Sequence, residues 1–112
     1  MTDELRLEGI GVSPGVLDTI VTMAAGSVED VAVVQAGGLA GFVKGAAKRG
    51  PAVTIDENGA MTATVHVTLR YGRPLHVVAG QVQQAVAEAL ASQTGQPVTA
   101  VDVFVDALVF DE

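Results

Sequence analysis

The chain has no cysteine, no tryptophan and few other aromatic residues, with three phenylalanines and one tyrosine among 112 residues. Without cysteine it can form neither disulfide bonds nor thiolate–metal sites, which fits a reducing compartment. No apolar run approaches the roughly 18 residues that a membrane-spanning helix needs, and Asp3 and Glu4 stand where a secretory signal would carry basic residues. We therefore expect a soluble protein that does not insert directly into a membrane.

Basic side chains are also scarce, with 6 lysines and arginines against 13 aspartates and glutamates and a net charge of −7. This balance disfavours broad binding to nucleic acid or to an anionic membrane. A candidate anion-binding patch nevertheless comprises Lys44, Lys48, Arg49, His66, Arg70 and Arg73. The alternative is that these are ordinary solvated surface charges, which usually have no specific binding function. Aromatic residues for base stacking are scarce around the patch, Tyr71 being the candidate, so nucleic acid binding is the weaker hypothesis.

The segment from Met61 to Tyr71 alternates strictly between apolar and polar residues. A period of two with one polar face predicts a strand that is covered on one side only, which is typical of a largely antiparallel sheet. Ala52 to Asp56 also alternates, and the intervening Glu57-Asn58-Gly59 suits a tight turn. These two strands are therefore predicted to form a hairpin.

Two amphipathic helices are predicted, one on each side of this hairpin in the sequence. Ser13 and Pro14 suit an N-cap and a first helical residue, and apolar residues recur at helical spacing behind them. Pro74 enters the first turn of the second helix, and Gly95 ends it. The two apolar stripes are expected to pack on the sheet.

Further strands are predicted at Val31 to Gln35 and at Val98 to Phe110, with an edge strand at Leu5 to Ile10. The expected fold is α+β, a small and mostly antiparallel sheet with two main helices on one face, in the order optional strand, helix, three strands, helix, strand. Residues 5–110 are expected to form a single domain. Within it, residues 37–50 contain five glycines and are predicted to be a mobile loop or a short helix.

The last predicted strand ends with apolar residues on both faces. Phe104, Leu108 and Phe110 are expected to share its second face with Asp106. Because such a strand needs cover on both sides, these residues suggest a protein interface. The candidate interface comprises Phe104, Leu108, Phe110, Leu39 and Phe42. The alternative is that they complete the core or cap the end of the sheet.

No catalytic constellation is recognisable in the sequence. His66 and Asp56 could face each other across the hairpin as an acid–base pair, but neither a nucleophile nor a second acid accompanies them. His66 and His76, without cysteine, do not form a metal-ligand pattern. The glycines of residues 37–41 lack the Gly-Lys-Ser/Thr ending of a phosphate-binding loop. We therefore expect no enzyme, no cofactor and no metal, and an enzyme centred on His66 is the least supported alternative.

The order and spacing of these elements resemble the alkaline shock protein family of bacterial envelope-stress proteins, over nearly the whole chain. The motifs that carry the resemblance are Tyr71-Gly72, Val82-Gln83, Thr94-Gly95 and Val101-Asp102-Val103. Two positions depart from the family pattern. Glu29-Asp30-Val31 stands where the family often has Gly-Val, and Asp102 stands where asparagine is common.

The resemblance implies a non-enzymatic, cytoplasmic bacterial protein with a role in cell-envelope homeostasis and stress. It also implies self-association into a homo-oligomer and action through protein partners, since some relatives are held at the inner face of the membrane by a membrane-anchored partner. The leading hypothesis is therefore an interaction or scaffold protein. The alternative is an anion- or nucleic-acid-binding regulatory module that uses the basic patch.

Overall fold

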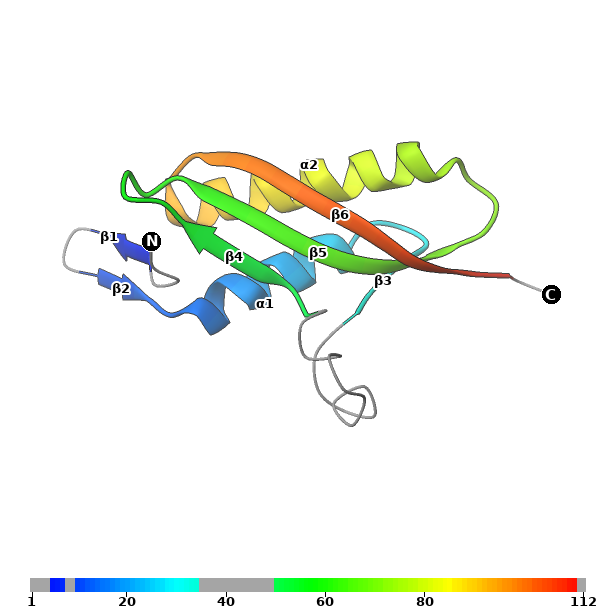
Figure 1. Ribbon diagram of the computed structural model, residues 1–112, viewed down its shortest axis with the longest axis horizontal. Coiled ribbons are helices and arrows are strands. Elements are labelled where there is room, and N and C mark those ends of the chain that lie inside the picture. The colour runs from blue at the N-terminus through cyan, green and yellow to red at the C-terminus, as the bar shows by residue number, and fades with distance from the viewer. Residues whose placement is uncertain (1–4, 8–9, 35–49, 111–112) are drawn as a thin grey trace.

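Two helices lie on one face of a central sheet in the computed structural model, which describes residues 5–7, 10–34 and 50–110 (Figure 1). Within these residues, no helix covers the other face of the sheet. The predicted α+β class, with both helices on one side, is confirmed.

The elements are β1 (Leu5–Leu7), β2 (Ile10–Val12), α1 (Pro14–Gly26), β3 (Val31–Val33), β4 (Ala52–Ile55), β5 (Met61–Arg70), α2 (Leu75–Thr94) and β6 (Val98–Val109). The predicted order holds from α1 onward. The expected single edge strand at the amino-terminal end is wrong, because β1 and β2 pair with each other as a separate two-stranded antiparallel sheet. The predicted loop or short helix at residues 37–50 lies, apart from Gly50, outside the described residues.

β5 is the central strand of the main sheet. β6 runs parallel to β5 and pairs with it along its whole length. β3 and β4 therefore share the opposite edge of β5, where both run antiparallel to it. A parallel neighbour requires a crossover connection, which α2 supplies between the end of β5 and the start of β6. The predicted sheet is thus confirmed as mostly antiparallel, with β6 as its parallel member.

The core lies between the helices and the covered face of the sheet. Every odd-numbered residue of β5 from Met61 to Leu69 is buried, as the alternation predicts. The helices contribute Leu17, Val21 and Ala25 from α1, and Val78, Val82, Val86 and Leu90 from α2. Fully burying an aliphatic side chain of this size contributes about 1.5–3 kcal/mol. This apolar seam is therefore what holds both helices on the sheet.

The turn between β4 and β5 and the end of α2 form where the sequence predicts them. Asp56 Oδ1 accepts hydrogen bonds from the backbone N–H groups of Asn58 and Ala60 at 2.8 and 2.9 Å, and Gly59 has a φ of 85°. Gly95 ends α2 with a φ of 75°. Glycine adopts this left-handed conformation without the steric cost that a Cβ brings. Both predicted breaks are confirmed.

α1 begins at Pro14 directly after Ser13, also as predicted. Ser13 has the extended backbone of an N-cap residue, and its carbonyl accepts the N–H of Val16 at 3.0 Å. Its hydroxyl, however, makes no capping hydrogen bond. The start of α1 therefore rests on the proline and on apolar packing more than on a side-chain cap.

Candidate interaction surfaces

The uncovered face of the sheet, which we call the open face, is mainly polar and carries one cluster of ring side chains. Phe104 of β6 lies opposite His66 of β5 and stacks on its imidazole, with ring centroids 4.9 Å apart and an interplanar angle of 18°. His66 Nδ1 lies 3.0 Å from Asp106 Oδ1. The aspartate thus orients the imidazole while the phenyl ring covers one of its faces. We call these three residues the open-face cluster.

The structure does not bring His66 to Asp56, the partner suggested by the sequence. Asp56 lies at the turn end of β4, where its carboxylate holds the turn, whereas His66 lies further along β5, opposite β6. Asp106 takes the place of Asp56 because β6 returns alongside β5, a pairing that local spacing does not reveal. The pair is partly accessible, with side chains of His66 and Asp106 that are 20% and 21% exposed.

A register shift in β6 places its last apolar residues on faces other than those predicted. Between Val67 and Thr68 the pairing skips one residue of β6. Leu108 thereby lies opposite Leu69, which is buried on the covered face. Because paired residues of neighbouring strands point to the same face, Leu108 lies on the helix side of the sheet while Phe104 lies on the open face. The prediction that these two residues share a face is wrong, because a bulge reverses the alternation.

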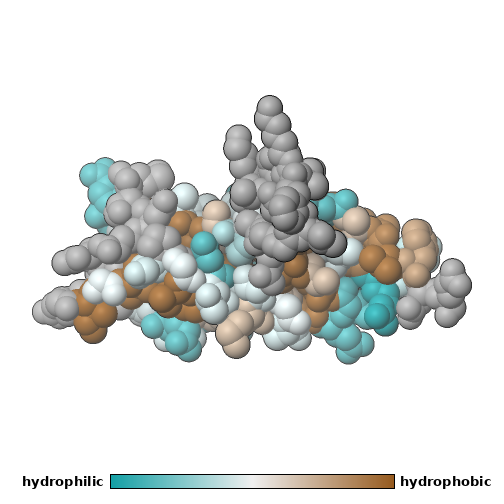
Figure 2. Space-filling model, turned by 90° about the horizontal axis from the view of Figure 1, so that it is seen from below, coloured by the Kyte–Doolittle hydropathy of each residue, from teal (hydrophilic) through white to brown (hydrophobic). Residues whose placement is uncertain are grey.

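A second apolar surface lies where β5 and β6 end. Phe110 is 65% exposed, and its ring centroid lies 4.9 Å from that of Tyr71. Leu108 forms one wall of a pocket of about 430 Å³ whose other walls come from the connection between β5 and α2. The C-terminal apolar cluster, as we name this exposed surface, comprises Tyr71, Leu75, Leu108 and Phe110. Figure 2 shows brown, hydrophobic surface toward the right-hand end of the molecule, the end at which β6 finishes in Figure 1.

The candidate interface of the sequence is therefore divided between two surfaces. Phe104 belongs to the open-face cluster, whereas Leu108 and Phe110 belong to the C-terminal apolar cluster. Leu39 and Phe42 lie outside the described residues.

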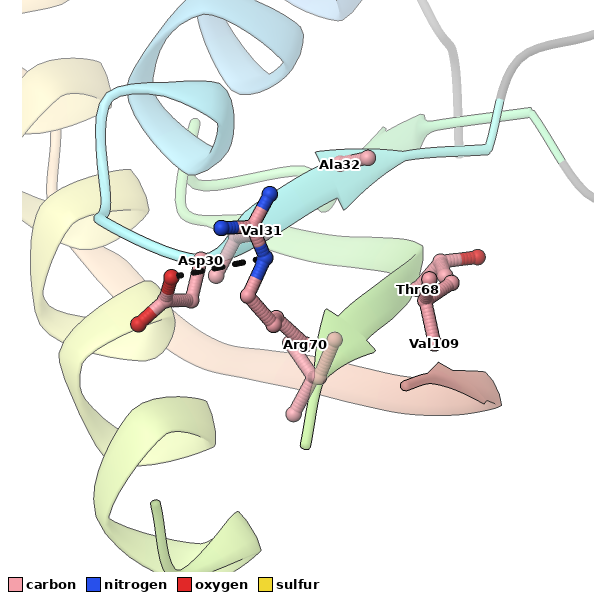
Figure 3. A pocket seen from close by; sticks show the side chains of 7 residues that line it. Asp30, Val31, Ala32, Thr68, Arg70 and Val109 are labelled. Carbon is pink, nitrogen blue, oxygen red and sulfur yellow. Dashed lines mark ion pairs between the residues drawn. The ribbon is translucent and has the colours of Figure 1, made fainter. Parts of the chain in front are cut away.

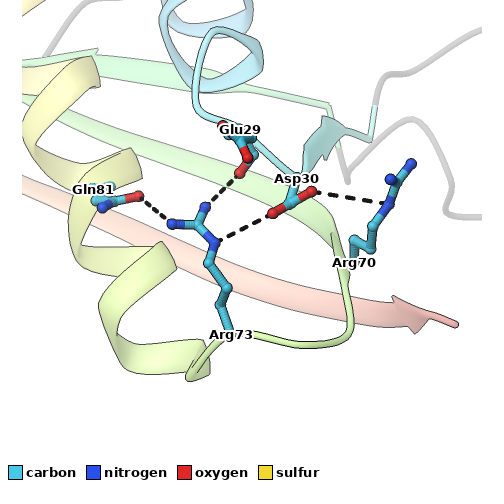
Figure 4. Close-up of polar contacts among 5 residues, drawn as sticks. All are labelled: Glu29, Asp30, Arg70, Arg73 and Gln81. Carbon is cyan, nitrogen blue, oxygen red and sulfur yellow. Dashed lines mark hydrogen bonds and ion pairs between the residues drawn. The ribbon is translucent and has the colours of Figure 1, made fainter. Parts of the chain in front are cut away.

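Arg70 and Arg73 of the predicted anion-binding patch lie beside Asp30, in the corner between α1 and β3 (Figure 4). Arg73 Nε is 3.2 Å from Asp30 Oδ2, an ion pair whose geometry is not that of a hydrogen bond. Arg73 also donates from Nη2 to the carbonyl oxygen of Glu29 at 2.7 Å and from Nη1 to Gln81 Oε1 at 3.4 Å. Arg70 Nε is more distant, 3.9 Å from Asp30 Oδ1.

Asp30 has a φ of 71°, and it is the one non-glycine residue with a positive φ in the described part of the chain. Its carbonyl oxygen accepts the backbone N–H of Arg70 at 2.9 Å, which ties the corner to the end of β5. Beside Asp30 and Arg70 lies a small pocket of about 190 Å³, which Val109 of β6 also lines (Figure 3). The corner thus joins α1, β3, β5 and the start of α2.

The basic patch is not assembled as one surface by its described members. His66 lies beside Asp106, and Arg70 and Arg73 lie beside Asp30. A carboxylate next to a cation compensates its charge locally and lowers its attraction for a further anion. The remaining candidates Lys44, Lys48 and Arg49 lie outside the described residues.

A groove between α2 and the free edge of β6 was not predicted. It is a shallow groove with a volume of about 390 Å³, lined by Gly80, Gln83, Gln84, Ala87, Val98, Thr99, Ala100 and Val101. Gln83 reaches β6 and donates from Nε2 to the carbonyl oxygen of Val101 at 3.0 Å. The small residues Gly80 and Ala87 were the available sequence signal. They could not be interpreted without knowing that β6 is an edge strand next to α2.

Among the residues that the structure describes, no three histidine, aspartate or glutamate side chains gather where they could hold a metal ion. Neither α1 nor α2 combines the length and the apolar character that crossing a bilayer requires.

As far as the structure describes the chain, the fold and these surfaces define a small α+β protein with helices on one face of its sheet, an open second face and a free edge at β6. The chain belongs to the alkaline shock protein family, because the sequence pattern of that family matches residues 3–110. The family is described as having a cell envelope-related function. Spy1535, an uncharacterized protein of Streptococcus pyogenes serotype M6, is 30% identical over 104 residues, which cover 92% of this chain and 81% of that protein. No solved structure matches the chain significantly. The family resemblance seen in the sequence is confirmed.

Proposed function

We propose that the protein is a non-enzymatic interaction module that serves cell-envelope homeostasis and the stress response through protein–protein contacts. The observation that carries this proposal is the exposure of large apolar side chains on and around β6, where Phe104 is 50% and Phe110 65% exposed. Aromatic side chains are enriched where proteins bind one another, and apolar clusters on small domains mark contact surfaces. The cell envelope-related function of the family supports the envelope as the place of action.

In this proposal the protein acts in the cytoplasm, at the inner face of the membrane, to which a membrane-anchored protein partner recruits it. The C-terminal apolar cluster serves self-association into a homo-oligomer, because its four residues gather at one end of the molecule. The open face and the edge of β6 remain available for the partner. Binding of anions through the basic patch is the weaker alternative, since its described members lie beside carboxylates.

Capture of partners in cells tests the interaction function. Cross-linking of the tagged full chain, followed by mass spectrometry of the envelope fraction, is expected to recover envelope proteins, and Phe104→Ser and Phe110→Ser should each recover less of them. Met23→Ser is the matched control, because Met23 is 71% exposed but lies on α1. Recovery of metabolic enzymes or nucleic acid alone, without an envelope protein, would contradict the proposal.

Sedimentation velocity tests the self-association separately. Phe110→Ser is expected to shift the oligomer toward smaller species, since truncating an aromatic residue at the centre of an interface commonly weakens binding by about 2 kcal/mol or more. The control Met23→Ser should sediment as the wild-type chain does. An unchanged oligomer in both Phe104→Ser and Phe110→Ser would exclude these side chains from the interface.

A further inference from the structure

β6 presents a long free edge. It has 12 residues and pairs with β5 on one side, and no other strand in the described part of the chain pairs with its second side. Natural sheets usually blunt such an edge with lysine, proline, bulges or short strand length. β6 contains neither lysine nor proline, is the longest strand of the sheet, and pairs without a register shift from Ala100 to Val105. Its middle therefore keeps the capacity to pair with another strand.

The hydrogen bonds of β5 show which residues of β6 offer their backbone groups to this edge. Even-numbered residues of β5 bond away from β6, as His66 does through its carbonyl to the N–H of Val34 at 2.8 Å. Odd-numbered residues bond toward β6, as Met61 does through its N–H to the carbonyl of Pro97 at 2.9 Å. In a parallel ladder, the residue opposite a bonding residue directs its own groups away from it. The outward residues of central β6 are therefore Val101, Val103 and Val105.

The hydrogen bond from Gln83 agrees with this assignment. The carbonyl of Val101 accepts it at 3.0 Å from the side of α2, so this carbonyl points away from β5. α2 thus forms one wall of a groove along the edge of β6. Gly80 leaves open space in this wall, since a Cβ placed on it would meet nothing within 4 Å. A strand added to β6 would point alternate side chains into this groove and onto the open face.

The negative charge around the groove indicates that a strand added to β6 must carry basic side chains. Asp102 and Asp106 stand along β6, Asp102 is exposed on the open face, and Glu88 is exposed on α2. Neither α2 nor β6 contains a lysine or an arginine. Antiparallel pairing of central β6 with a second copy of itself would place these aspartates opposite or diagonally beside their counterparts, and like charges at such positions are destabilising. A strand with cations at alternate positions instead places one beside each carboxylate.

We infer that the groove between α2 and β6 binds an extended, lysine- or arginine-bearing segment of a partner protein, which adds to β6 as a further strand. The basic side chains of this segment lie on the open face beside Asp102 and Asp106. Its intervening small apolar side chains enter the groove past Gly80. The inference rests on the proposed interaction function and specifies the chemistry of the partner.

Peptide binding to the full chain tests the charge requirement. The probe is a short fluorescent peptide in which lysine alternates with valine or threonine, and the control probe has glutamate in place of lysine. The wild-type chain should bind the lysine peptide, with affinity that falls as ionic strength rises, and should not bind the glutamate peptide. Asp102→Lys should weaken binding of the lysine peptide about tenfold or more, since attraction is replaced by repulsion.

Glu57→Lys is the matched control for Asp102→Lys. It changes the net charge by the same amount, but Glu57 is an exposed residue of the turn between β4 and β5. Binding of the lysine peptide should therefore change less than about twofold, because Glu57 precedes β5 whereas Asp102 pairs with Thr64 within it, and solvent screens charges that are not in direct contact. Equal loss in the two variants would show attraction to the overall charge of the chain and would overturn the inference.

The backbone requirement is tested on the wild-type chain, so that it does not depend on the folding of a variant. N-methylation of alternate peptide nitrogens is placed in one of two registers, and only the register whose N–H groups face β6 should abolish binding. Equal behaviour of both registers would overturn strand addition. So would a wild-type oligomer that excludes the peptide, because its β6 edge would then be occupied by a second copy.

These outcomes separate the inference from the function on which it rests. If the lysine peptide does not bind while envelope proteins are still captured from cells, the groove is not the partner site and the interaction function stands. If the peptide binds as described but no envelope protein is captured, the strand-addition site stands and the envelope function is wrong.

Discussion

At the residue scale, Asp30 shows how a single residue stabilises the connection between α1 and β3. A φ of 71° is unfavourable for most residues with a Cβ, although aspartate and asparagine tolerate it better than others. The family resemblance implies that glycine often stands before the valine at this corner. In this chain the carboxylate of Asp30 faces Arg73, and its carbonyl oxygen bonds the N–H of Arg70. The aspartate therefore combines a tolerated backbone conformation with a contact that glycine cannot make.

Substitutions at Asp30 separate these two contributions. Asp30→Ala should lower the free energy of unfolding by about 1–2 kcal/mol, because it retains the unfavourable φ and loses the ion pair. Asp30→Gly should lose about 1 kcal/mol less than Asp30→Ala, because glycine is free to adopt this φ. Asp30→Asn keeps the tolerant side chain and measures the charge alone. Urea denaturation of the three variants provides the values. Equal losses for alanine and glycine would show that the backbone at this corner is not strained.

At the scale of elements, α2 and β6 together form the least predictable part of the molecule. α2 is a regular helix of 20 residues that ends at Gly95, and both features follow from local spacing. Its outer face, however, combines Gly80 with Ala87 beside a strand that runs parallel to β5. The groove is thus a property of two elements in a particular arrangement, and neither element shows it alone.

Gly80 inside α2 and Gly95 at its end should respond oppositely to substitution by alanine. Gly80→Ala should raise the stability of the protein by up to about 1 kcal/mol, because Gly80 lies inside α2 and an added Cβ meets nothing within 4 Å. Gly95→Ala should lower it by about 1 kcal/mol, because the φ of 75° is unfavourable for alanine although space is also available there. Thermal unfolding followed by circular dichroism measures both. A loss of stability in Gly80→Ala would mean that this part of α2 has no room for a methyl group.

The elements that the sequence predicts well are those specified by neighbouring residues. The hairpin of β4 and β5 and the break at Gly95 depend on turn chemistry and on local periods of two and 3.6 residues. The contacts that were missed join distant segments, such as His66 with Asp106, 40 residues apart, and Arg73 with the carbonyl of Glu29, 44 apart. The first depends on the parallel register of β6 and on its bulge, and the second on the pairing of β3 with the end of β5. The alternation of apolar and polar residues in the sequence gives no sign of the bulge, but the extra residue reverses which face the following side chains point to. The sequence therefore predicts the wrong face for Leu108.

At the scale of the whole molecule, the sheet separates two environments. One face packs on α1 and α2 through aliphatic side chains that are almost fully buried, and the other carries threonines, the open-face cluster and Arg70. Antiparallel sheets tolerate such a one-sided arrangement, whereas a sheet covered on both faces would read as apolar throughout. The interaction function and the strand-addition site both require that the open face and the edge of β6 remain accessible.

Neighbouring substitutions in β5 test this separation directly. Val65 is fully buried toward the helices, and Thr64 lies next to it in the strand and faces the other way. Val65→Ala should lower the free energy of unfolding by about 2–3 kcal/mol, since it removes two buried methyl groups and leaves a cavity. Thr64→Ala should lower it by less than about 1 kcal/mol, which reflects strand propensity and partial exposure. Both values are obtained from urea denaturation of the dilute protein. A loss in Thr64→Ala as large as that in Val65→Ala would indicate that a further layer covers the open face, which would leave no surface there for a partner.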